Sequence, residues 1–328
     1  MLESENLEMG LVVNGGSWMN INNILVAGAY EENFKKQLPK TIGQNFRFVP
    51  ADLITDKDLS WADAYVGSQP SRHFHFSKIK WVHSFNAGVN NFLEWNGWVE
   101  NQVLLTRTIC SFGQRISEYC LSYILQDLQY HHEFSKKQRE KNWSKKTPKM
   151  VKDVTIVIFG TGEIGQEVAR TFHHLGATVY GVSQSGKEKA YFQKVTTLSK
   201  AESLLPKADW VIGTLPLTNE TKGLFNHELL NYFQGAGLIN VGRGATIDDQ
   251  ALIDALNERK VRQAVLDVFA VEPLPIDSEL WERDDVVVTP HISAVTELDE
   301  AIDCFIETLE KISNNEELPN KVDFSKGY

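Results

Sequence analysis

The chain has 328 residues, of which 42% are hydrophobic and 23% are charged, and its formal net charge is −10 at pH 7. This length predicts about two domains, and the hydrophobic content is sufficient for packed cores, which excludes a disordered chain. The negative charge argues against nucleic acid and anionic membranes as partners.

The sequence shows no signal for secretion, membrane insertion or metal binding. The segment before about residue 20 is acidic where a secretory signal is basic, so we expect a cytoplasmic protein, with a frayed N-terminal extension or a start codon assigned too early. No apolar run is long enough to span a membrane. The three cysteines lack metal-ligand spacing and imply no disulfide framework, so we expect no metal.

The first part of the chain alternates short apolar strands with helices or loops. Strands are predicted over residues 23–27, 46–49, 64–66 and 80–84, and near 103–105. A long amphipathic helix is then predicted over roughly residues 116–142, because apolar residues recur there at helical spacing.

A dinucleotide fingerprint follows. Residues 155–160 form a short, β-branched, apolar run that leads directly into Gly160-Thr-Gly162-Glu-Ile-Gly165 and a helical pattern. In such a turn the glycines allow a tight bend, close approach of a pyrophosphate and close helix packing. The phosphates are bound by the N–H groups at the helix N-terminus. A glycine-rich turn in some other strand-helix-strand unit is the alternative, and the second strand at 178–182 argues against it.

The second strand of this unit lacks the acidic residue that normally binds the adenosine ribose. Ser183, Gln184 and Ser185 follow the strand instead, and Lys187 and Lys189 come next. These hydroxyl and ammonium groups can bind a 2′-phosphate, whereas a carboxylate would repel it. The segment therefore favours NADP(H) over NAD(H). Because it lacks an arginine, a site that accepts both cofactors stays open.

Further strands are predicted over residues 210–214, 237–241, 263–268 and 286–289, with helices between them and a last helix over 298–312. Strand-helix alternation with short loops predicts an α/β fold with parallel sheets covered on both faces. We expect a dinucleotide-binding domain over residues 104–294, and a substrate domain formed by residues 1–103 and 295–328.

Three motifs carry the chemistry, at residues 240–244, 266–275 and 288–293, and they contain Arg243, Glu272 and His291. A guanidinium binds a carboxylate bidentately, and an imidazole exchanges a proton near neutral pH. A carboxylate next to the imidazole orients it and favours its charged form. This set predicts hydride transfer to a 2-oxo acid. The alternatives are a surface ion pair for Arg243 and a structural loop residue for His291.

Over nearly its whole length the chain resembles the D-isomer-specific 2-hydroxyacid dehydrogenase family. The resemblance rests on residues 80–89, 112–118, 214–224 and 320–328, on the glycine fingerprint and on the three catalytic motifs. It implies a Rossmann cofactor domain inserted in a flavodoxin-like substrate domain. It also implies an NAD(P)-dependent enzyme, similar to glyoxylate/hydroxypyruvate reductases, that interconverts a small 2-oxo acid and its D-2-hydroxy acid.

The resemblance also implies site residues. The substrate carboxylate is expected to contact Arg243, His291 and the backbone N–H groups of Asn86, Ala87, Gly88 and Val89. Asp267 resembles the residue that binds the nicotinamide carboxamide; alternatively, it only caps the loop after its strand. Gly242 stands where the family more often has alanine. The expected cofactor-binding residues are Gly160, Thr161, Gly162, Glu163, Ile164, Gly165, Ser183, Gln184, Ser185, Thr214, Leu215, Pro216, Val241, Gly242 and Asp267.

Two expectations concern assembly and function class. The helix from Ile116 has more apolar positions than one domain face needs, and the family resembled is commonly dimeric through this region, so we expect a two-fold homodimer. The alternative function is a dinucleotide-sensing binding protein of the corepressor type, which keeps the Arg243, Glu272 and His291 set.

Overall fold

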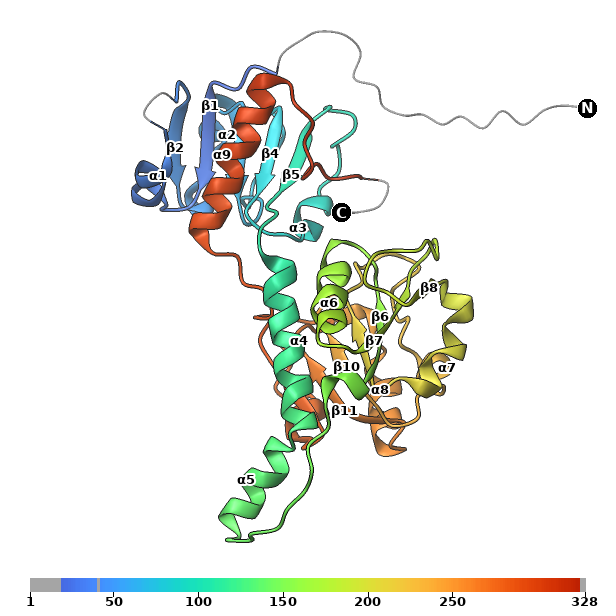
Figure 1. Cartoon of the computed structure of the whole chain (residues 1–328). Coiled ribbons are helices and arrows are strands. Elements are labelled where there is room, and N and C mark those ends of the chain that lie inside the picture. The colour runs from blue at the N-terminus through green and yellow to red at the C-terminus, as the bar shows by residue number, and fades with distance from the viewer. Residues whose placement is uncertain (1–18, 40–41, 325–328) are drawn as a thin grey trace, which may run out of the picture. The chain divides into compact units, whose positions relative to one another are not determined.

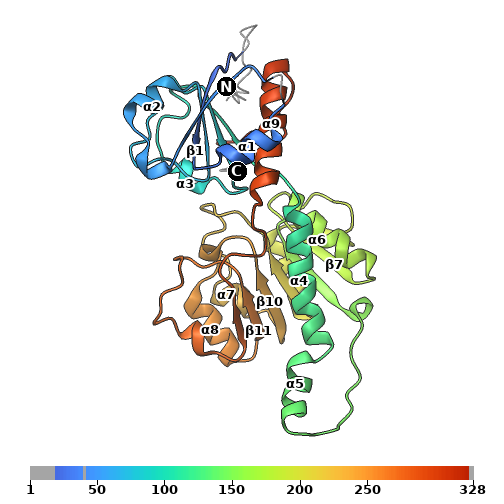
Figure 2. The ribbon, with the colours of Figure 1, turned by 90° about the vertical axis from the view of Figure 1, so that its left-hand side faces the viewer.

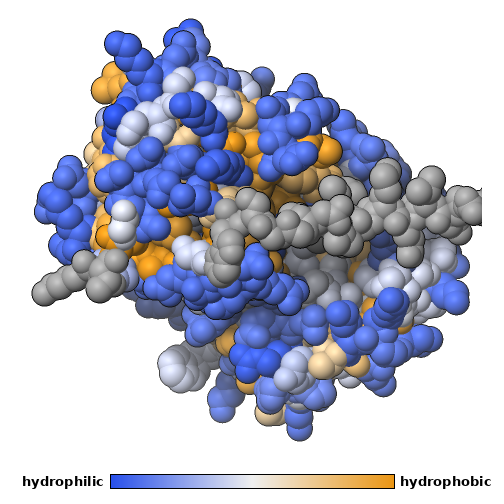
Figure 3. All heavy atoms as spheres, turned by 90° about the horizontal axis from the view of Figure 1, so that it is seen from above, coloured by the Kyte–Doolittle hydropathy of each residue, from blue (hydrophilic) through white to orange (hydrophobic). Residues whose placement is uncertain are grey.

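The computed structural model describes residues 19–39 and 42–324, so the predicted N-terminal extension and the last four residues lie outside it. The chain divides into two compact units. The first is Met1–Thr108 with Leu298–Val322, and the second is Ile109–Glu297 with the C-terminal residues. Within the described part of the chain, no helix has the length and apolar character to span a membrane. The face shown in Figure 3 is mostly hydrophilic, with smaller hydrophobic areas between polar side chains.

The first unit is a five-stranded parallel sheet in the order β2-β1-β3-β4-β5 (Figure 1). Helices α1 and α9 cover one face of the sheet, and α2 and α3 cover the other (Figure 2). The elements are β1 (Asn23–Ala27), α1 (Glu31–Gln37), β2 (Asn45–Val49), α2 (Asp56–Trp61), β3 (Ala64–Gly67), β4 (Trp81–Ser84), α3 (Asn90–Leu93), β5 (Leu104–Arg107) and α9 (Leu298–Asn314).

The last helix of the chain completes the core of this first unit. Phe305 of α9 is fully buried, and its ring stacks on that of Trp81 with centroids 5.3 Å apart. The ring of Phe34 from α1 lies 5.7 Å from the same phenylalanine. Burial of these large side chains supplies much of the driving force for this core. The two ends of the described chain therefore build one unit together.

The second unit is a seven-stranded parallel sheet in the order β12-β11-β10-β9-β6-β7-β8. The chain enters at β6, continues to β7 and β8 on one side, and then crosses to β9 and the strands beyond it. Helices α4 and α6 cover one face, and α7 and α8 cover the other (Figure 2). The elements are α4 (Phe112–Leu128), α5 (His131–Arg139), β6 (Thr155–Phe159), α6 (Glu163–His174), β7 (Thr178–Val182), β8 (Lys194–Thr196), β9 (Trp210–Gly213), α7 (His227–Leu230), β10 (Ala236–Asn240), α8 (Asp249–Asn257), β11 (Val261–Leu266) and β12 (Val286–Val288).

The predicted α/β fold with parallel sheets is confirmed, but the single long helix over 116–142 is wrong. Helix α4 ends at Leu128 and α5 starts at His131, because Tyr130 between them has a left-handed φ of 56°. The ammonium of Lys146 lies 3.7 Å from the centre of the Tyr130 ring, which joins the following loop to this bend. Helix α5 and that loop extend away from the sheet of the second unit (Figures 1 and 2).

His83 on β4 is one of several polar residues that are fully buried in the first unit. Its Nδ1 atom lies 2.9 Å from Thr106 Oγ1, which also accepts a hydrogen bond of 2.8 Å from Trp81 Nε1. The threonine oxygen accepts from the indole, and the direction of its contact with Nδ1 is set by the tautomer of the imidazole. Burial lowers the pKa of His83 to about 3.

Because His83 is buried, we predict that acid lowers the free energy of unfolding. Below about pH 6.5 the unfolded chain protonates His83 but the folded chain does not, so the free energy of unfolding decreases as the pH falls from there towards 3. Between about pH 7 and pH 5 the loss from this residue is about 2 kcal/mol. Urea unfolding of His83→Asn should show a smaller loss over this range than the wild type. The exposed His132→Asn serves as the control, and equal slopes in all three proteins would contradict the prediction.

Candidate active site

The predicted cofactor and catalytic residues of the second unit gather at one edge of its sheet. Strands β6, β9, β10, β11 and β12 are parallel neighbours, so the loops that follow them leave from the same edge. Ligands of open α/β sheets bind at this carboxyl edge, beside the point where the strand order reverses. Here that point lies between β6 and β9. The first residues of these loops are Gly160, Thr214, Val241, Asp267 and Thr289.

The glycine turn after β6 has the shape that a phosphate group requires. Gly160 has a φ of 103°, which side-chain-bearing residues rarely adopt, and a Cβ on Gly165 would lie 1.9 Å from the Gly160 oxygen. Gly162, by contrast, is exposed, and a Cβ added to it would meet no atom within 4 Å. Its open backbone precedes the positive end of α6, where anions are stabilised. The residues present therefore fit a dinucleotide.

The loop after β7 is folded by its two serines. Ser183 Oγ accepts a hydrogen bond of 3.2 Å from the Gly186 N–H, and Ser185 Oγ accepts one of 3.3 Å from the Lys187 N–H. Each hydroxyl still has one hydrogen with which to donate. Gln184, Ser185 and Lys187 are exposed. The loop thus presents hydroxyl and ammonium donors where an acidic residue is usual.

Two glycines allow the loop that carries Arg243 to pack closely against the loops on either side of it. A Cβ on Gly242 would lie 2.5 Å from the Leu215 oxygen, and a Cβ on Gly244 would lie 1.9 Å from the Phe269 carbonyl carbon. The first contact leaves no room for a side chain at position 242. The second brings the loop after β10 against the loop after β11.

The backbone oxygen of Arg243 is fixed by donors of its own loop. Asn240 Nδ2 donates to it over 3.1 Å, and Thr246 Oγ1 donates over 2.6 Å. The guanidinium Nη1 donates to the Gly242 oxygen over 2.7 Å. Arg243 is half-buried, so its cation is held at the carboxyl edge of the sheet.

His291 and Glu272 form a direct pair. The imidazole Nδ1 lies 2.9 Å from Glu272 Oε2, and Glu272 Oε1 accepts a hydrogen bond of 2.9 Å from the Phe269 N–H. This contact engages Nδ1, so the other ring nitrogen, Nε2, takes no part in the pair. The His291 side chain is 50% exposed, so a substrate can reach it.

Asp267 organises the loop that carries His291. Its side chain is fully buried, and its carboxylate accepts hydrogen bonds from Thr289 Oγ1 (2.6 Å), the Ile292 N–H (2.8 Å) and the Ser293 N–H (2.8 Å). The backbone N–H of His291 donates to the Asp267 backbone oxygen over 2.9 Å. These are the contacts expected of a loop cap. Contact of Asp267 with the cofactor stays a prediction.

The predicted substrate loop belongs to the first unit and follows β4. The backbone N–H of Asn86 donates to Ser84 Oγ over 3.1 Å, and its role toward the substrate stays a prediction. Its side chain ties the loop to Ser68 at the end of β3 (2.9 Å). Sequence reasoning missed Arg107, whose Nη1 lies 3.5 Å from the Ala87 oxygen. Arg107 ends β5, two residues beyond the strand predicted near 103–105, and it adds positive charge beside this loop.

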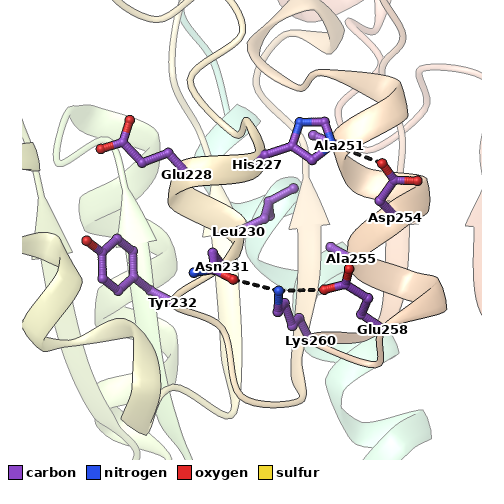
Figure 4. A pocket seen from close by; sticks show the side chains of 10 residues that line it. All are labelled: His227, Glu228, Leu230, Asn231, Tyr232, Ala251, Asp254, Ala255, Glu258 and Lys260. Atoms are coloured by element: carbon purple, nitrogen blue, oxygen red, sulfur yellow. Dashed lines mark hydrogen bonds and ion pairs between the residues drawn. The ribbon is translucent and has the colours of Figure 1, made fainter.

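A separate surface pocket of about 420 Å³ lies between α7 and α8 (Figure 4). His227 Nε2 is 2.9 Å from Asp254 Oδ2 there, and Lys260 Nζ is 2.6 Å from Asn231 Oδ1. The pocket includes none of the predicted site residues, and its cationic groups His227 and Lys260 pair with Asp254 and Glu258. It is therefore not the candidate site. The part of the chain that the structure describes contains no cluster of three or more side chains arranged to hold a metal ion.

The sequence of the chain is similar to that of known proteins. Residues 121–293 match the model of the family described as D-isomer specific 2-hydroxyacid dehydrogenase, NAD binding domain. A glyoxylate/hydroxypyruvate reductase A of Citrobacter koseri is 30% identical over 273 residues, which cover 81% of this chain and 87% of that protein.

Solved structures show the same architecture. A D-isomer specific 2-hydroxyacid dehydrogenase from Xanthobacter autotrophicus Py2, in complex with NADPH and MES, superposes with a TM-score of 0.84 at 28% identity. An NADPH-dependent glyoxylate/hydroxypyruvate reductase from Sinorhizobium meliloti, in complex with NADP and sulfate, superposes with a TM-score of 0.83 at 26% identity. Each match covers 94% of this chain and 100% of the other.

Proposed function

Because the chain belongs to the D-isomer-specific 2-hydroxyacid dehydrogenase family, a family of NAD(P)-dependent oxidoreductases, we propose that it reduces a small 2-oxo acid to the D-2-hydroxy acid. In this proposal His291 is the proton donor. The observation that carries it is the 2.9 Å contact between His291 and Glu272 at the carboxyl edge of a cofactor-binding sheet. The relatives named glyoxylate/hydroxypyruvate reductases support a substrate of that size.

Each residue of the proposed site has its own role in the reaction. The nicotinamide cofactor, when bound, supplies the hydride. Arg243 binds the substrate carboxylate through its planar guanidinium. His291 gives the proton on Nε2 to the ketone oxygen, and Glu272 holds the ring in place through Nδ1. Ala87, Gly88 and Val89 are proposed as backbone donors to the same carboxylate.

NADP(H) is the proposed cofactor. The loop after β7 offers hydroxyl donors at Ser183 and Ser185 and the ammonium of Lys187, all groups that suit a 2′-phosphate. The solved relatives from X. autotrophicus and S. meliloti were crystallised with NADPH and NADP, respectively.

A homodimer is proposed on different grounds from those expected. The apolar residues of α4, such as Ile116 and Ile124, are buried in the core of their own unit and leave little for a partner. Trp143, in the loop after α5, is 95% exposed. Tryptophan is enriched in the buried centres of protein interfaces, and a second copy of the chain is the usual partner in soluble oligomers. The cytoplasmic location stays a prediction.

Removal of the imidazole tests the proposed mechanism. His291→Gln should lower kcat/KM for the best substrate of a 2-oxo acid panel by about 10²–10⁴-fold, because it removes the proton donor. The dissociation constant of the cofactor should stay near the wild-type value. His227→Gln is the control, since this exposed histidine also pairs with a carboxylate at 2.9 Å. A His291 variant with half the wild-type activity would remove this residue from the mechanism.

The carboxylate of Glu272 can be tested separately. Glu272→Gln should lower kcat/KM for reduction by about 10- to 100-fold, because hydrogen bonds to a charged group are worth about 1.5–3 kcal/mol and an amide replaces the carboxylate that holds His291 through Nδ1. The measurement compares kcat/KM of the wild type and the variant with the same substrate. A variant with the wild-type value would count against this pairing.

Cofactor preference is tested by comparing kcat/KM for NADPH and NADH with one substrate, and NADPH should give the higher value. Ser183→Asp should harm NADPH use far more than NADH use, since a new carboxylate repels the 2′-phosphate. Ser203→Asp, an exposed serine elsewhere in the unit, is the control. A tenfold preference for NADH, about 1.4 kcal/mol, would refute NADP(H) as the cofactor. Equal losses with both cofactors would show that Ser183 does not face the ribose.

Light scattering tests the assembly and should give twice the mass of one chain at micromolar concentration. Trp143→Ser should shift the population towards the single chain, because it removes the exposed apolar contact. Trp281→Ser, which changes another exposed tryptophan, is the control. The mass of one chain for the wild type would exclude the dimer.

A further inference from the structure

We propose that Tyr119 is a positioning residue for His291, acting through a hydrogen-bonded chain that runs from its phenol through Thr289 to Asp267. The proposal rests on the proposed function, in which His291 donates the proton. Tyr119 lies on α4, 170 residues before Thr289 in the sequence. None of the three catalytic motifs contains it.

Which group donates at each of these hydrogen bonds follows from the number of hydrogens that each group carries. The Asp267 carboxylate can only accept, so Thr289 Oγ1, 2.6 Å from Oδ1, uses its single hydrogen to donate to it. At its other contact, 2.6 Å from the Tyr119 hydroxyl, the threonine oxygen must therefore accept and the phenol must donate. Burial raises the pKa of Tyr119 well above its ordinary value, so the phenol keeps this proton.

The chain ends on the turn that carries His291. That residue has a φ of 54°, which residues other than glycine rarely adopt. Asp267 holds the turn on both sides, through Thr289 before His291 and through the N–H groups of Ile292 and Ser293 after it. Any shift of the carboxylate therefore moves the imidazole.

Tyr119 connects this turn to a rigid element. The side chain is half-buried and packs against the core between α4, α6 and the sheet. Its hydroxyl fixes Thr289, and Thr289 fixes one oxygen of Asp267. A catalytic group must be held within a fraction of an ångström of its working position. The phenol supplies part of that restraint without touching the substrate.

Tyr119→Phe removes only the hydroxyl and should lower kcat about threefold to tenfold, the range expected for one hydrogen bond. The KM for the cofactor should stay near wild type because the ring remains packed. The melting temperature should fall by no more than a few degrees, since one hydrogen bond contributes about 0.5–1.5 kcal/mol to stability. Tyr123→Phe is a matched control: its ring lies 4.9 Å from that of Tyr119 on the same helix, and its hydroxyl is not part of the chain. A Tyr119→Phe kcat equal to that of Tyr123→Phe overturns the proposal.

Thr289 provides an independent pair of variants. Thr289→Val keeps the shape of the side chain but breaks both hydrogen bonds, so it should lose more kcat than Tyr119→Phe. Thr289→Ser keeps the hydroxyl and should restore most of the activity. A serine variant as impaired as the valine variant would show that the methyl group matters and the hydroxyl does not, which overturns the proposal.

Hydrogen exchange tests the same chain without turnover. The amides of Ile292 and Ser293 donate to Asp267, and in Tyr119→Phe they should exchange about threefold to tenfold faster than in Tyr123→Phe. Unchanged exchange in Tyr119→Phe contradicts the positioning role. Failure of the wild type to reduce any 2-oxo acid would overturn the proposed function alone, because the exchange result does not depend on activity.

Discussion

The candidate site depends on one buried carboxylate. Asp267 is fully buried at the end of β11, and three donors from the loop after β12 bind its oxygens. A buried carboxylate is costly unless such donors satisfy it, so the loop and the acid stabilise each other. Between those donors lies His291, whose left-handed backbone persists only where its surroundings enforce it. Packing and hydrogen bonding at the sheet edge thus fix the orientation of the imidazole.

Short contacts connect the loops that carry Arg243 and Glu272 to the loop that carries His291. Gly244 allows the loop after β10 to lie against Phe269, whose N–H is bound by Glu272. Glu272 in turn reaches the imidazole of His291. The loops that follow three neighbouring parallel strands therefore present Arg243, Glu272 and His291 from one edge of the sheet. A parallel sheet provides this convergence, because every strand ends on the same side.

The sequence predicted the strands well and the long-range contacts poorly. The run at 155–159 coincides with β6 because a buried, β-branched segment has a strong local signal. The helix predicted beyond Leu128 failed at Tyr130, since its left-handed conformation leaves no trace in apolar periodicity. The N–H of Asn86 is bound within its own loop, which only the folded backbone reveals. A contact such as Tyr119 to Thr289 depends on tertiary packing, so one sequence cannot predict it.

We propose that this edge of the sheet performs catalysis and does not merely sense a dinucleotide. The decisive experiment mixes the full chain with NADPH and a panel of small 2-oxo acids, and measures both cofactor oxidation and the enantiomer formed. NADPH should be oxidised in an amount equal to that of the D-2-hydroxy acid formed. Binding of NADPH without oxidation by any 2-oxo acid, or formation of the L-enantiomer, would refute the proposal.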